Sequence, residues 1–336
     1  MDEMDMEDIA KALVAPSKGI LAADESTGTI KKRLDSINTE STEDTRRAYR
    51  ELLFTTEGVS DYISGVILYD ETIRQTASDG RPFGKLLEAQ GIIPGIKVDM
   101  GAKPLAFSDG ELVTEGLDGL RERLAEYSRL GARFAKWRAV IGIGDGAPSQ
   151  YCIDTNAHAL ARYAALCQEA NIVPIVEPEV LMDGDHNIDE CYAVTETTLK
   201  TVFDELYKQR VVLEQMLLKP NMVISGVDCP IQADIEEVAT KTLYCFEQTV
   251  PAAVPGIVFL SGGQSEQRAT EHLNSMNQMG KFPWEISYSF GRALQASALS
   301  TWQGKEANIA AAKAAFLHRA KLTSAARDGE YSADME

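Results

Sequence analysis

Eight short apolar runs, each followed by a segment with helical periodicity, are the feature that most constrains the fold of this chain. The runs occupy residues 19–24, 62–70, 92–99, 132–140, 172–180, 216–223, 256–263 and 284–292. Strands that alternate with helices pair in parallel, because each helix returns the chain to the same end of the sheet. The sheet is then either open and doubly wound or closed into a (β/α)8 barrel. Eight regular repeats without a break in composition favour the closed TIM barrel, of the α/β class.

Two of the intervening segments have specific helix signals. Ser41 and Asp44 form a plausible capping pair ahead of an amphipathic helix that Gly58 is expected to end. In residues 154–171 the apolar side chains recur at helical spacing and form one face, which consists of Ala157, Leu160, Ala161, Ala164 and Cys167.

The length of 336 residues allows either two ordinary domains or one large barrel. Because the repeats continue without a linker, we expect one domain over residues 1–336. The barrel is expected over about residues 18–300, and a C-terminal helix and short tail over about 301–336.

The overall charge of the chain limits its partners. A formal net charge of −18 argues against a general role on nucleic acid, whose phosphates require a basic surface. We also expect no membrane association, because no run approaches the roughly 20 apolar residues of a spanning helix and the acidic start is unlike a secretory signal. Five widely spaced cysteines without a C-x-x-C pair are typical of a reduced, cytoplasmic protein.

Metal and dinucleotide sites are not expected. The histidines, His158, His186, His272 and His318, are far apart and lack the spacing of metal ligands, although His186 in a predicted loop is the one weighed as a ligand. "GIGDGA" at residues 142–147 does not match the G-x-G-x-x-G fingerprint and does not lie in a first strand–helix turn. We therefore predict that the chain uses no cofactor.

Charged side chains interrupt the apolar runs near their carboxyl ends. Residues two apart on a strand share a face, so that three pairs each point the same way: Lys136 with Arg138, Glu177 with Glu179, and Lys97 with Asp99. One such residue alone is most often a strand end that reaches solvent. Several that converge on the active face of a barrel predict a shared, charged pocket.

Lys219 stands out because it follows an apolar run and directly precedes Pro220. A lysine that is buried beside other cations, here Lys136 and Arg138, gives up its proton more readily than an exposed one. The neutral amine is a nucleophile that converts a ketone into an iminium, or Schiff base. The iminium draws electrons from the neighbouring carbon–carbon bond and so allows that bond to break.

Schiff-base chemistry also requires groups that carry protons. Glu177, Glu179 and Asp24 are suitable acids and bases, because burial and nearby cations can separate their pKa values. Glu177 and Asp24 can exchange roles in this interpretation. The structural alternative is that the carboxylates only pair with Lys136 and Arg138 in an ion network.

Two glycine-containing segments predict a phosphate site. "LSGGQS" follows the seventh run and "SFGRA" ends the eighth, where barrels often bind phosphate through backbone N–H groups. Arg292 can add a bidentate contact. The alternative is a glycine-rich turn without a ligand.

These residues resemble one known family, the class I, Schiff-base-forming fructose-bisphosphate aldolases. The resemblance extends from about residue 18 to residue 300 and rests on "KGILAADESTGTIKKRL", "RPFGKLL", "GIKVD", "FAKWR", "NIVPIVEPE", "DGDH", "LLKPNMV", "FLSGGQSE" and "GRALQASAL". It implies a lyase that reversibly cleaves fructose 1,6-bisphosphate into dihydroxyacetone phosphate and glyceraldehyde 3-phosphate in glycolysis and gluconeogenesis. It further implies a metal-independent, cytoplasmic homotetramer.

The resemblance assigns roles to individual residues. It implies that Lys219 forms the Schiff base, that Glu177 is the main acid and base, that Asp24 and Lys136 assist bond cleavage, and that Glu179 supports them. One phosphate is expected on Ser261, Gly262, Gly263, Gly291 and Arg292, near Ser289. The other is expected on Ser26 and Lys97, with Thr29, Lys32, Arg33 and Arg138 as neighbouring groups.

Three positions depart from the family pattern. Phe290 stands where tyrosine is usual, and Thr29 where serine is common. The sequence ends in "GEYSADME", whereas the animal members have a longer mobile tail that ends in tyrosine. We expect that Tyr331 does not replace that residue, which leaves open the preference between fructose 1,6-bisphosphate and fructose 1-phosphate.

Two alternative functions remain from the sequence. The first is another Schiff-base barrel enzyme that acts on phosphosugars, of the transaldolase kind. The second is a phosphosugar-binding or scaffold protein that keeps the fold without turnover.

Overall fold

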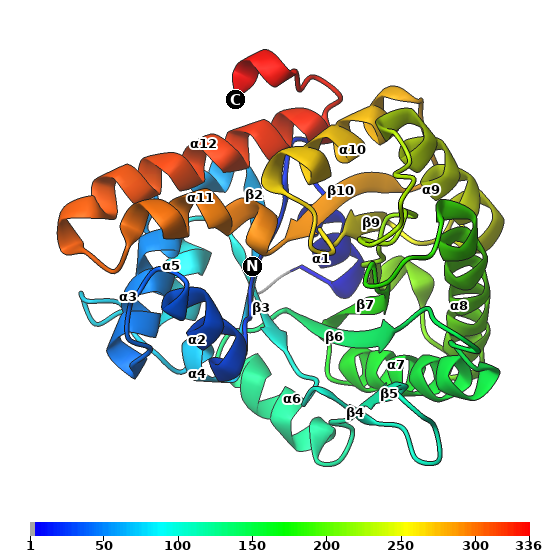
Figure 1. Ribbon diagram of the computed structural model, residues 1–336. Helices are drawn as coiled ribbons and strands as arrows, with labels where there is room; N and C mark the ends of the chain where they lie inside the picture. The colour runs from blue at the N-terminus through cyan, green and yellow to red at the C-terminus, as the bar shows by residue number, and fades with distance from the viewer. Residues whose placement is uncertain (1–3) are drawn as a thin grey trace.

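A computed structural model describes residues 4–336 and has eight parallel strands closed into one barrel (Figure 1). Around the barrel the strand order is β1-β10-β9-β8-β7-β6-β3-β2. The closed sheet confirms the predicted barrel and rules out the open, doubly wound alternative. The strands are β1 Gly19–Ala23, β2 Ile63–Leu68, β3 Ile93–Lys97, β6 Phe134–Ile141, β7 Val173–Val180, β8 Leu217–Leu218, β9 Gly256–Phe259 and β10 Glu285–Phe290.

Each of the eight predicted runs coincides with one barrel strand. Strand β6 extends one residue past its run, to Ile141, and the run around Lys219 forms only the two-residue strand β8. Its backbone nevertheless continues the pairing for one more residue, because Lys219 N donates to Val176 O at 2.8 Å. Lys219 therefore stands directly at the carboxyl end of β8, beside the longer strand β7.

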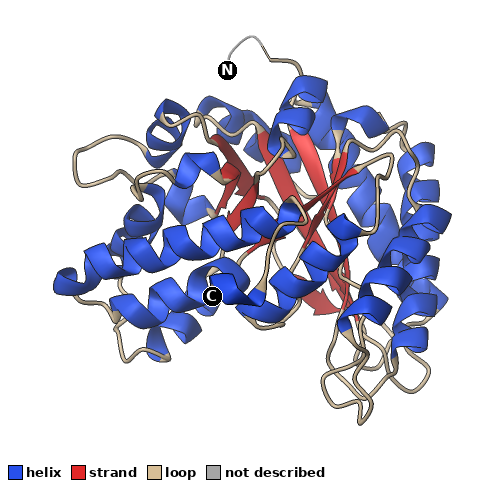
Figure 2. Ribbon diagram, turned by 90° about the horizontal axis from the view of Figure 1, so that it is seen from above, coloured by secondary structure: helices blue, strands red, loops and turns tan. Residues whose placement is uncertain are grey.

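Helices surround the strands of the barrel, as Figure 2 shows. They are α2 Thr27–Asp35, α3 Glu43–Phe54, α4 Asp70–Ile73, α5 Phe83–Ala89, α6 Leu120–Arg129, α7 Gln150–Glu169, α8 Ile188–Lys208, α9 Ile235–Thr249, α10 Glu266–Gln278, α11 Arg292–Trp302 and α12 Ile309–Arg327. One further helix, α1 Met6–Leu13, precedes the first strand. A two-stranded antiparallel hairpin, β4 Ala102–Pro104 and β5 Leu112–Thr114, lies between β3 and α6 in the chain.

The predicted boundaries of α3 are wrong by a few residues. Thr42, not Ser41, caps the helix, and its side chain accepts from Thr45 N while Thr45 Oγ1 accepts from Thr42 N. Asp44 lies in the first turn instead of serving in the capping pair. The helix ends at Phe54, and Gly58, with φ of 79°, begins the next short turn instead. Threonine occupies both capping positions, where the sequence predicted serine and aspartate. A threonine hydroxyl can accept the same backbone hydrogen bond as those side chains.

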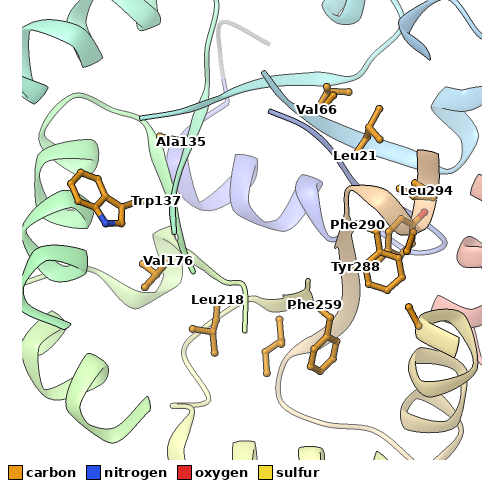
Figure 3. Close-up of a cluster of buried hydrophobic side chains, with 14 of the residues drawn as sticks. Leu21, Val66, Ala135, Trp137, Val176, Leu218, Phe259, Tyr288, Phe290 and Leu294 are labelled. Atoms are coloured by element: carbon orange, nitrogen blue, oxygen red, sulfur yellow. The ribbon is translucent and has the colours of Figure 1, made fainter. Parts of the chain in front are cut away.

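The predicted apolar face of the long central helix is confirmed in α7. The five residues of that face, Ala157, Leu160, Ala161, Ala164 and Cys167, are all buried. The helix packs against β6 through Trp137 and Tyr163, whose ring centroids lie 5.6 Å apart. Side chains that the strands turn toward the helices form the main core, and Figure 3 shows part of it, including Leu21, Val66, Val176, Leu218 and Phe259.

A second apolar cluster fills the amino end of the barrel and includes helix α1. Ile9, Ala10 and Leu13 of α1 pack there against side chains that point into the barrel, namely Ile20, Ile67, Ile93, Phe134, Val173, Ile175, Leu217 and Val258. Glycines make room for the larger members: a Cβ on Gly95 would lie 2.3 Å from the Phe134 ring. The cluster closes the barrel at this end.

Within residues 4–336, no helix has the length and apolar composition that crossing a membrane would require. All five cysteines are unpaired and buried. The predicted domain over residues 1–336 includes residues 1–3, which lie outside the described part of the chain.

Candidate active site

The carboxyl ends of the barrel strands surround a cavity of about 1160 Å³. Every site residue predicted from the sequence lines it. They are Lys219, Glu177, Asp24, Lys136, Glu179, Ser26, Thr29, Arg33, Lys97, Arg138, Ser261, Gly262, Gly263, Ser289, Gly291 and Arg292, together with the neighbouring Lys32. Residues that are as many as 268 positions apart in the chain, from Asp24 to Arg292, therefore share one wall.

Strand alternation places the central residues. On β6, Lys136 and Arg138 line the cavity, whereas Trp137 between them is buried among the helices. On β7, Glu177 lines the cavity, and Val176 before it packs in the main core. The period of two that the sequence indicates thus holds in the structure.

Four side chains in the cavity floor form a continuous ionic network. Lys219 Nζ lies 3.1 Å from Glu177 Oε1, and Lys136 Nζ lies 3.1 Å from Glu177 Oε2. Lys136 Nζ also lies 2.7 Å from Asp24 Oδ2. Lys219, Glu177 and Lys136 are each at most 4% exposed. One carboxylate, Glu177, therefore bridges the two lysines and can exchange protons with either.

The network controls protonation. Burial alone would raise the pKa of Asp24, but the ammonium groups of Lys136 and Lys219 outweigh it and hold that pKa well below its usual range. Burial is likewise outweighed at Glu177, where Lys136, Lys219 and Arg138 lower the pKa. For Lys136, burial would lower the pKa, but Asp24 and Glu177 raise it. At neutral pH both carboxyl groups are therefore ionised and Lys136 is charged.

Two further ion pairs lie on the cavity wall. Arg138 Nε donates to Glu179 Oε2, which is the pairing that the ion-network alternative anticipated for Glu179. Lys97 Nζ donates to Asp99 Oδ1 at 2.5 Å. Arg138 is half-exposed at the cavity surface, with 43% of its side chain accessible, and can meet a ligand while paired.

The glycine-rich segments adjoin one another at one side of the cavity. Gly262 and Gly263 have positive φ values of 56° and 85°, which glycine adopts without strain. A Cβ on Gly263 would lie 3.1 Å from Arg292 Nη2, so Arg292 at the start of α11 lies against this turn. Ser289 Oγ is buried beside them and has no hydrogen-bond partner within residues 4–336. The arrangement combines a guanidinium, a free hydroxyl and a helix start, which suits a phosphate.

Helix α2 brings a second set of polar groups to the cavity wall. Ser26 caps the helix, and its hydroxyl lies 3.1 Å from Thr29 Oγ1. Arg33, two turns later, lines the cavity and donates to Glu25.

Part of the cavity wall was not predicted from the sequence. It comes from α4, α6 and the turn before the β4–β5 hairpin, and includes Tyr69, Asp70, Arg74, Met100, Gly101, Ala102, Arg123, Glu126 and Tyr127. Asp70 accepts from Arg74 and from Tyr127 Oη at 2.9 Å. Asp70 ends the second apolar run, a signal that could have identified it, whereas the residues of α6 follow no strand end.

Several other sequence features lie outside the cavity. Residues 142–147 do not line it. His186 lies in a loop, as predicted, but is buried, and within residues 4–336 no three potential ligands from His, Cys, Asp and Glu are grouped to hold a metal. Phe290 is buried in the main core. Tyr331 Oη donates to Glu336 at 2.7 Å, away from the cavity lining.

Comparison with known proteins identifies the family. A family model described as fructose-bisphosphate aldolase class-I matches residues 5–336. The probable class 1 fructose-bisphosphate aldolase of Xanthomonas campestris is 60% identical over 323 residues, which are 96% of this chain and 97% of that protein. Cytosolic fructose-bisphosphate aldolase 6 of Arabidopsis thaliana is 57% identical, with coverage of 95% and 89%.

A solved structure shows the same fold. The fructose-bisphosphate aldolase of Plasmodium falciparum, solved as a ternary complex with TRAP and a small-molecule inhibitor, superposes with a TM-score of 0.96 at 50% identity. The match covers 97% of this chain and 95% of that one. Together with the family model, these matches confirm the resemblance in the sequence motifs: the chain belongs to the class I fructose-bisphosphate aldolases.

Proposed function

We propose that this chain reversibly cleaves fructose 1,6-bisphosphate into dihydroxyacetone phosphate and glyceraldehyde 3-phosphate through a Schiff base on Lys219. Its family membership supports the reaction and the lyase class. The observation that carries the choice of lysine is the position of Lys219 Nζ, buried in the cavity 3.1 Å from a carboxylate. No cofactor is needed, because the iminium itself accepts the electrons of the breaking bond.

Glu177 is proposed to carry the protons of Schiff-base formation. The ionised Glu177 first takes a proton from the Lys219 ammonium group, and the neutral amine attacks the ketone. Glu177 then gives the proton to the hydroxyl that leaves the carbinolamine as water. Glu177 is within hydrogen-bond reach of that nitrogen and is also 3.1 Å from the charged Lys136, which can resupply a proton.

Asp24 is proposed to act in bond cleavage with Lys136. As the carbon–carbon bond breaks, its electron pair moves to the iminium and the hydroxyl of the departing aldehyde loses a proton. An ionised carboxylate held by Lys136 at 2.7 Å is a suitable acceptor for that proton. The alternative is that Glu177 accepts it and Asp24 positions the hydroxyl. Glu179, paired with Arg138, supports the network from the wall.

The two phosphates are proposed to bind to two different sets of residues in the cavity wall. One lies against Ser261, Gly262, Gly263, Ser289, Gly291 and Arg292, and the other against Ser26 and Lys97 with Thr29, Lys32, Arg33 and Arg138. Holding both ends of the sugar places its carbonyl at Lys219 and converts binding energy into correct orientation.

Borohydride trapping tests the proposal. Reduction in the presence of dihydroxyacetone phosphate converts a Schiff base into a stable secondary amine, which peptide mass mapping locates. We expect one label, on the peptide that contains Lys219. No label, or a label on another lysine, would contradict the assignment of Lys219 as the Schiff-base lysine and favour a non-catalytic phosphosugar-binding protein. A labelled lysine without cleavage of fructose 1,6-bisphosphate would favour the transaldolase-like alternative.

We further propose a cytoplasmic, homotetrameric protein with a single domain over residues 1–336. The family resemblance supports the tetramer, and the composition and the absence of a membrane-spanning helix within residues 4–336 are compatible with the cytoplasm.

A further inference from the structure

One carboxylate at the edge of the cavity is shared by two arginines. Glu25 follows β1 and is buried, with 7% of its surface exposed. Arg33 Nη1 donates to its Oε1, and Arg50 Nη2 lies 2.6 Å from its Oε2. Arg33 lines the cavity, whereas Arg50, on α3, does not. Arg50 therefore reaches the cavity only through Glu25.

The shared carboxylate is held in place from a further direction. Gln295 on α11 donates from Nε2 to Glu25 Oε1 at 3.0 Å and to Ala22 O at 2.8 Å. Its own Oε1 accepts from Tyr49 Oη at 3.1 Å. Because contacts from α2, α3 and α11 converge on it, Glu25 has little freedom to rotate.

Arg33 in turn borders the proposed phosphate sites. A Cβ on Gly291 would lie 3.9 Å from Arg33 Nη2, so this guanidinium stands between the start of α11 and helix α2. An anion in this part of the cavity would interact with its charge.

The charges of the three groups explain why two arginines are present. If Glu25 paired with Arg33 alone, the two would neutralise each other and present little field to an anion. With Arg50 added, the cluster carries a net charge of +1. Its most exposed member is Arg33, whose side chain is 23% exposed against 3% for Arg50 and 4% for Glu25.

Arg50 is not arranged as a purely stabilising residue would be. Its Nε and Nη1 are buried and have no hydrogen-bond partner within residues 4–336. A buried guanidinium with unsatisfied donors costs stability, and replacing buried ion pairs by apolar groups is often neutral or favourable.

We infer that Arg50 is a positioning residue for substrate binding: it balances the charge of Glu25 so that Arg33 keeps a net positive charge for a substrate phosphate. This inference rests on the proposed function, because it takes a phosphosugar as the ligand. It adds a residue that does not touch the substrate.

Steady-state kinetics of Arg50→Met test the inference. The substitution keeps most of the side-chain volume and removes the charge, so KM for fructose 1,6-bisphosphate rises about tenfold, a size expected when one charge is removed from a buried cluster. The value of kcat changes by less than about twofold, because the Lys219 network is untouched. Arg47→Met is the matched control: Arg47 is on the same helix, pairs with Glu51 and does not line the cavity. It leaves both constants unchanged.

A double variant separates charge balance from structural damage. In Glu25→Gln with Arg50→Met, both charges are removed, and Arg33 again has an unneutralised charge. KM returns to within about threefold of the wild-type value, which is strong non-additivity between contacting residues. Structural damage would instead make the losses of the two substitutions accumulate. Additive losses, or an unchanged KM in Arg50→Met, would overturn the inference.

Folding and the proposed function are checked in the same experiment. Circular dichroism and borohydride trapping of Lys219 are measured for every variant. If Arg50→Met does not fold, Arg50→Lys keeps the charge and is expected to retain a KM within about threefold of wild type, and a tenfold increase there would overturn the charge argument. Trapping in the wild type with an unchanged KM in Arg50→Met refutes only this inference. Absence of trapping in the wild type refutes the proposed function.

Discussion

The carboxyl end of the barrel holds a network of lysines and carboxylates, whereas the amino end is filled by apolar side chains and closed by α1. Both ends belong to the same faces of the same strands. On β6, Phe134 lies in the apolar cluster, and Lys136 and Arg138, two and four residues later, line the cavity. On β7, Ile175 and Glu177 follow the same order. On one face of a strand, a buried apolar side chain is therefore followed by a charged, cavity-lining side chain only two or four residues later, at about 7 Å for each two residues.

This difference shows which part of the barrel offsets the free-energy cost of burying the charged residues of the site. Burying Lys136, Lys219 and their carboxylates is unfavourable unless the charges are paired, and the pairs compensate only part of that cost. The apolar cluster below them contributes favourable burial without polar groups to satisfy. We therefore expect substitutions at the two ends to affect different quantities, chemistry at one and stability at the other.

The largest expected effect is at the carboxyl end. Lys219→Met removes the amine and should lower kcat by roughly 10⁴-fold or more, as loss of a nucleophile does in other enzymes. Because the phosphate contacts are unchanged, the Kd of a hexitol bisphosphate, which has no carbonyl, should change by less than about threefold. Calorimetry measures that Kd.

The matched control is Lys200→Met, at an exposed lysine of α8 whose side chain is 57% accessible. It should leave kcat unchanged. Loss of hexitol bisphosphate binding in Lys219→Met would mean that the lysine holds the structure of the site instead of the chemistry.

A large effect on stability is expected at the amino end. Phe134→Ala leaves a cavity between Gly65, Gly95 and α1 and should lower the free energy of unfolding by about 3–5 kcal/mol. Urea denaturation measures this loss. The kcat of the folded enzyme should change far less, and a fall in kcat comparable to that of a site variant would break the separation of the two ends.

Phe107→Ala provides a control of the same residue type. Phe107 lies in the β4–β5 hairpin and is fully exposed. Its truncation should change the free energy of unfolding by less than about 0.5 kcal/mol.

The smallest effect is on the pH dependence of stability. The pKa of Asp24 is lower in the folded protein than in the unfolded chain, so its contribution is present above about pH 4 and is lost as the pH falls through the lowered pKa. Asp24→Asn removes this contribution. The variant should be less stable at pH 7, but its free energy of unfolding should fall less between pH 7 and pH 3 than that of the wild type. An equal fall would contradict the role of the Lys136 pairing.

The sequence predicted the barrel and the central site because both leave periodic signals. Each strand run is a local apolar pattern, and Lys136, Glu177 and Lys219 are charges that interrupt such runs. Their distances were not predictable, since the bridging of two lysines by Glu177 depends on how β6, β7 and β8 are staggered.

Features without a local signal were missed. Arg50 is one of several arginines in an amphipathic helix, and only the packing of α3 against Glu25 distinguishes it from Arg46 and Arg47. The wall from α6 was missed because the β4–β5 hairpin separates that helix from the end of β3, so that no strand end points to it. The start of α3 was placed one residue early because Ser41 and Thr42 are equivalent caps in sequence.

The closure of the barrel by α1 has a consequence for the folding of the chain while the ribosome is still synthesising it. Its apolar side chains, Ile9, Ala10 and Leu13, are made first, but their partners extend to Val258. At 5–20 residues per second, the ribosome needs roughly 10–50 seconds to reach that strand after α1 is complete. During this interval the helix cannot find its final contacts. A chaperone that covers these three residues on the nascent chain would therefore protect an apolar segment whose last partner is made long after it.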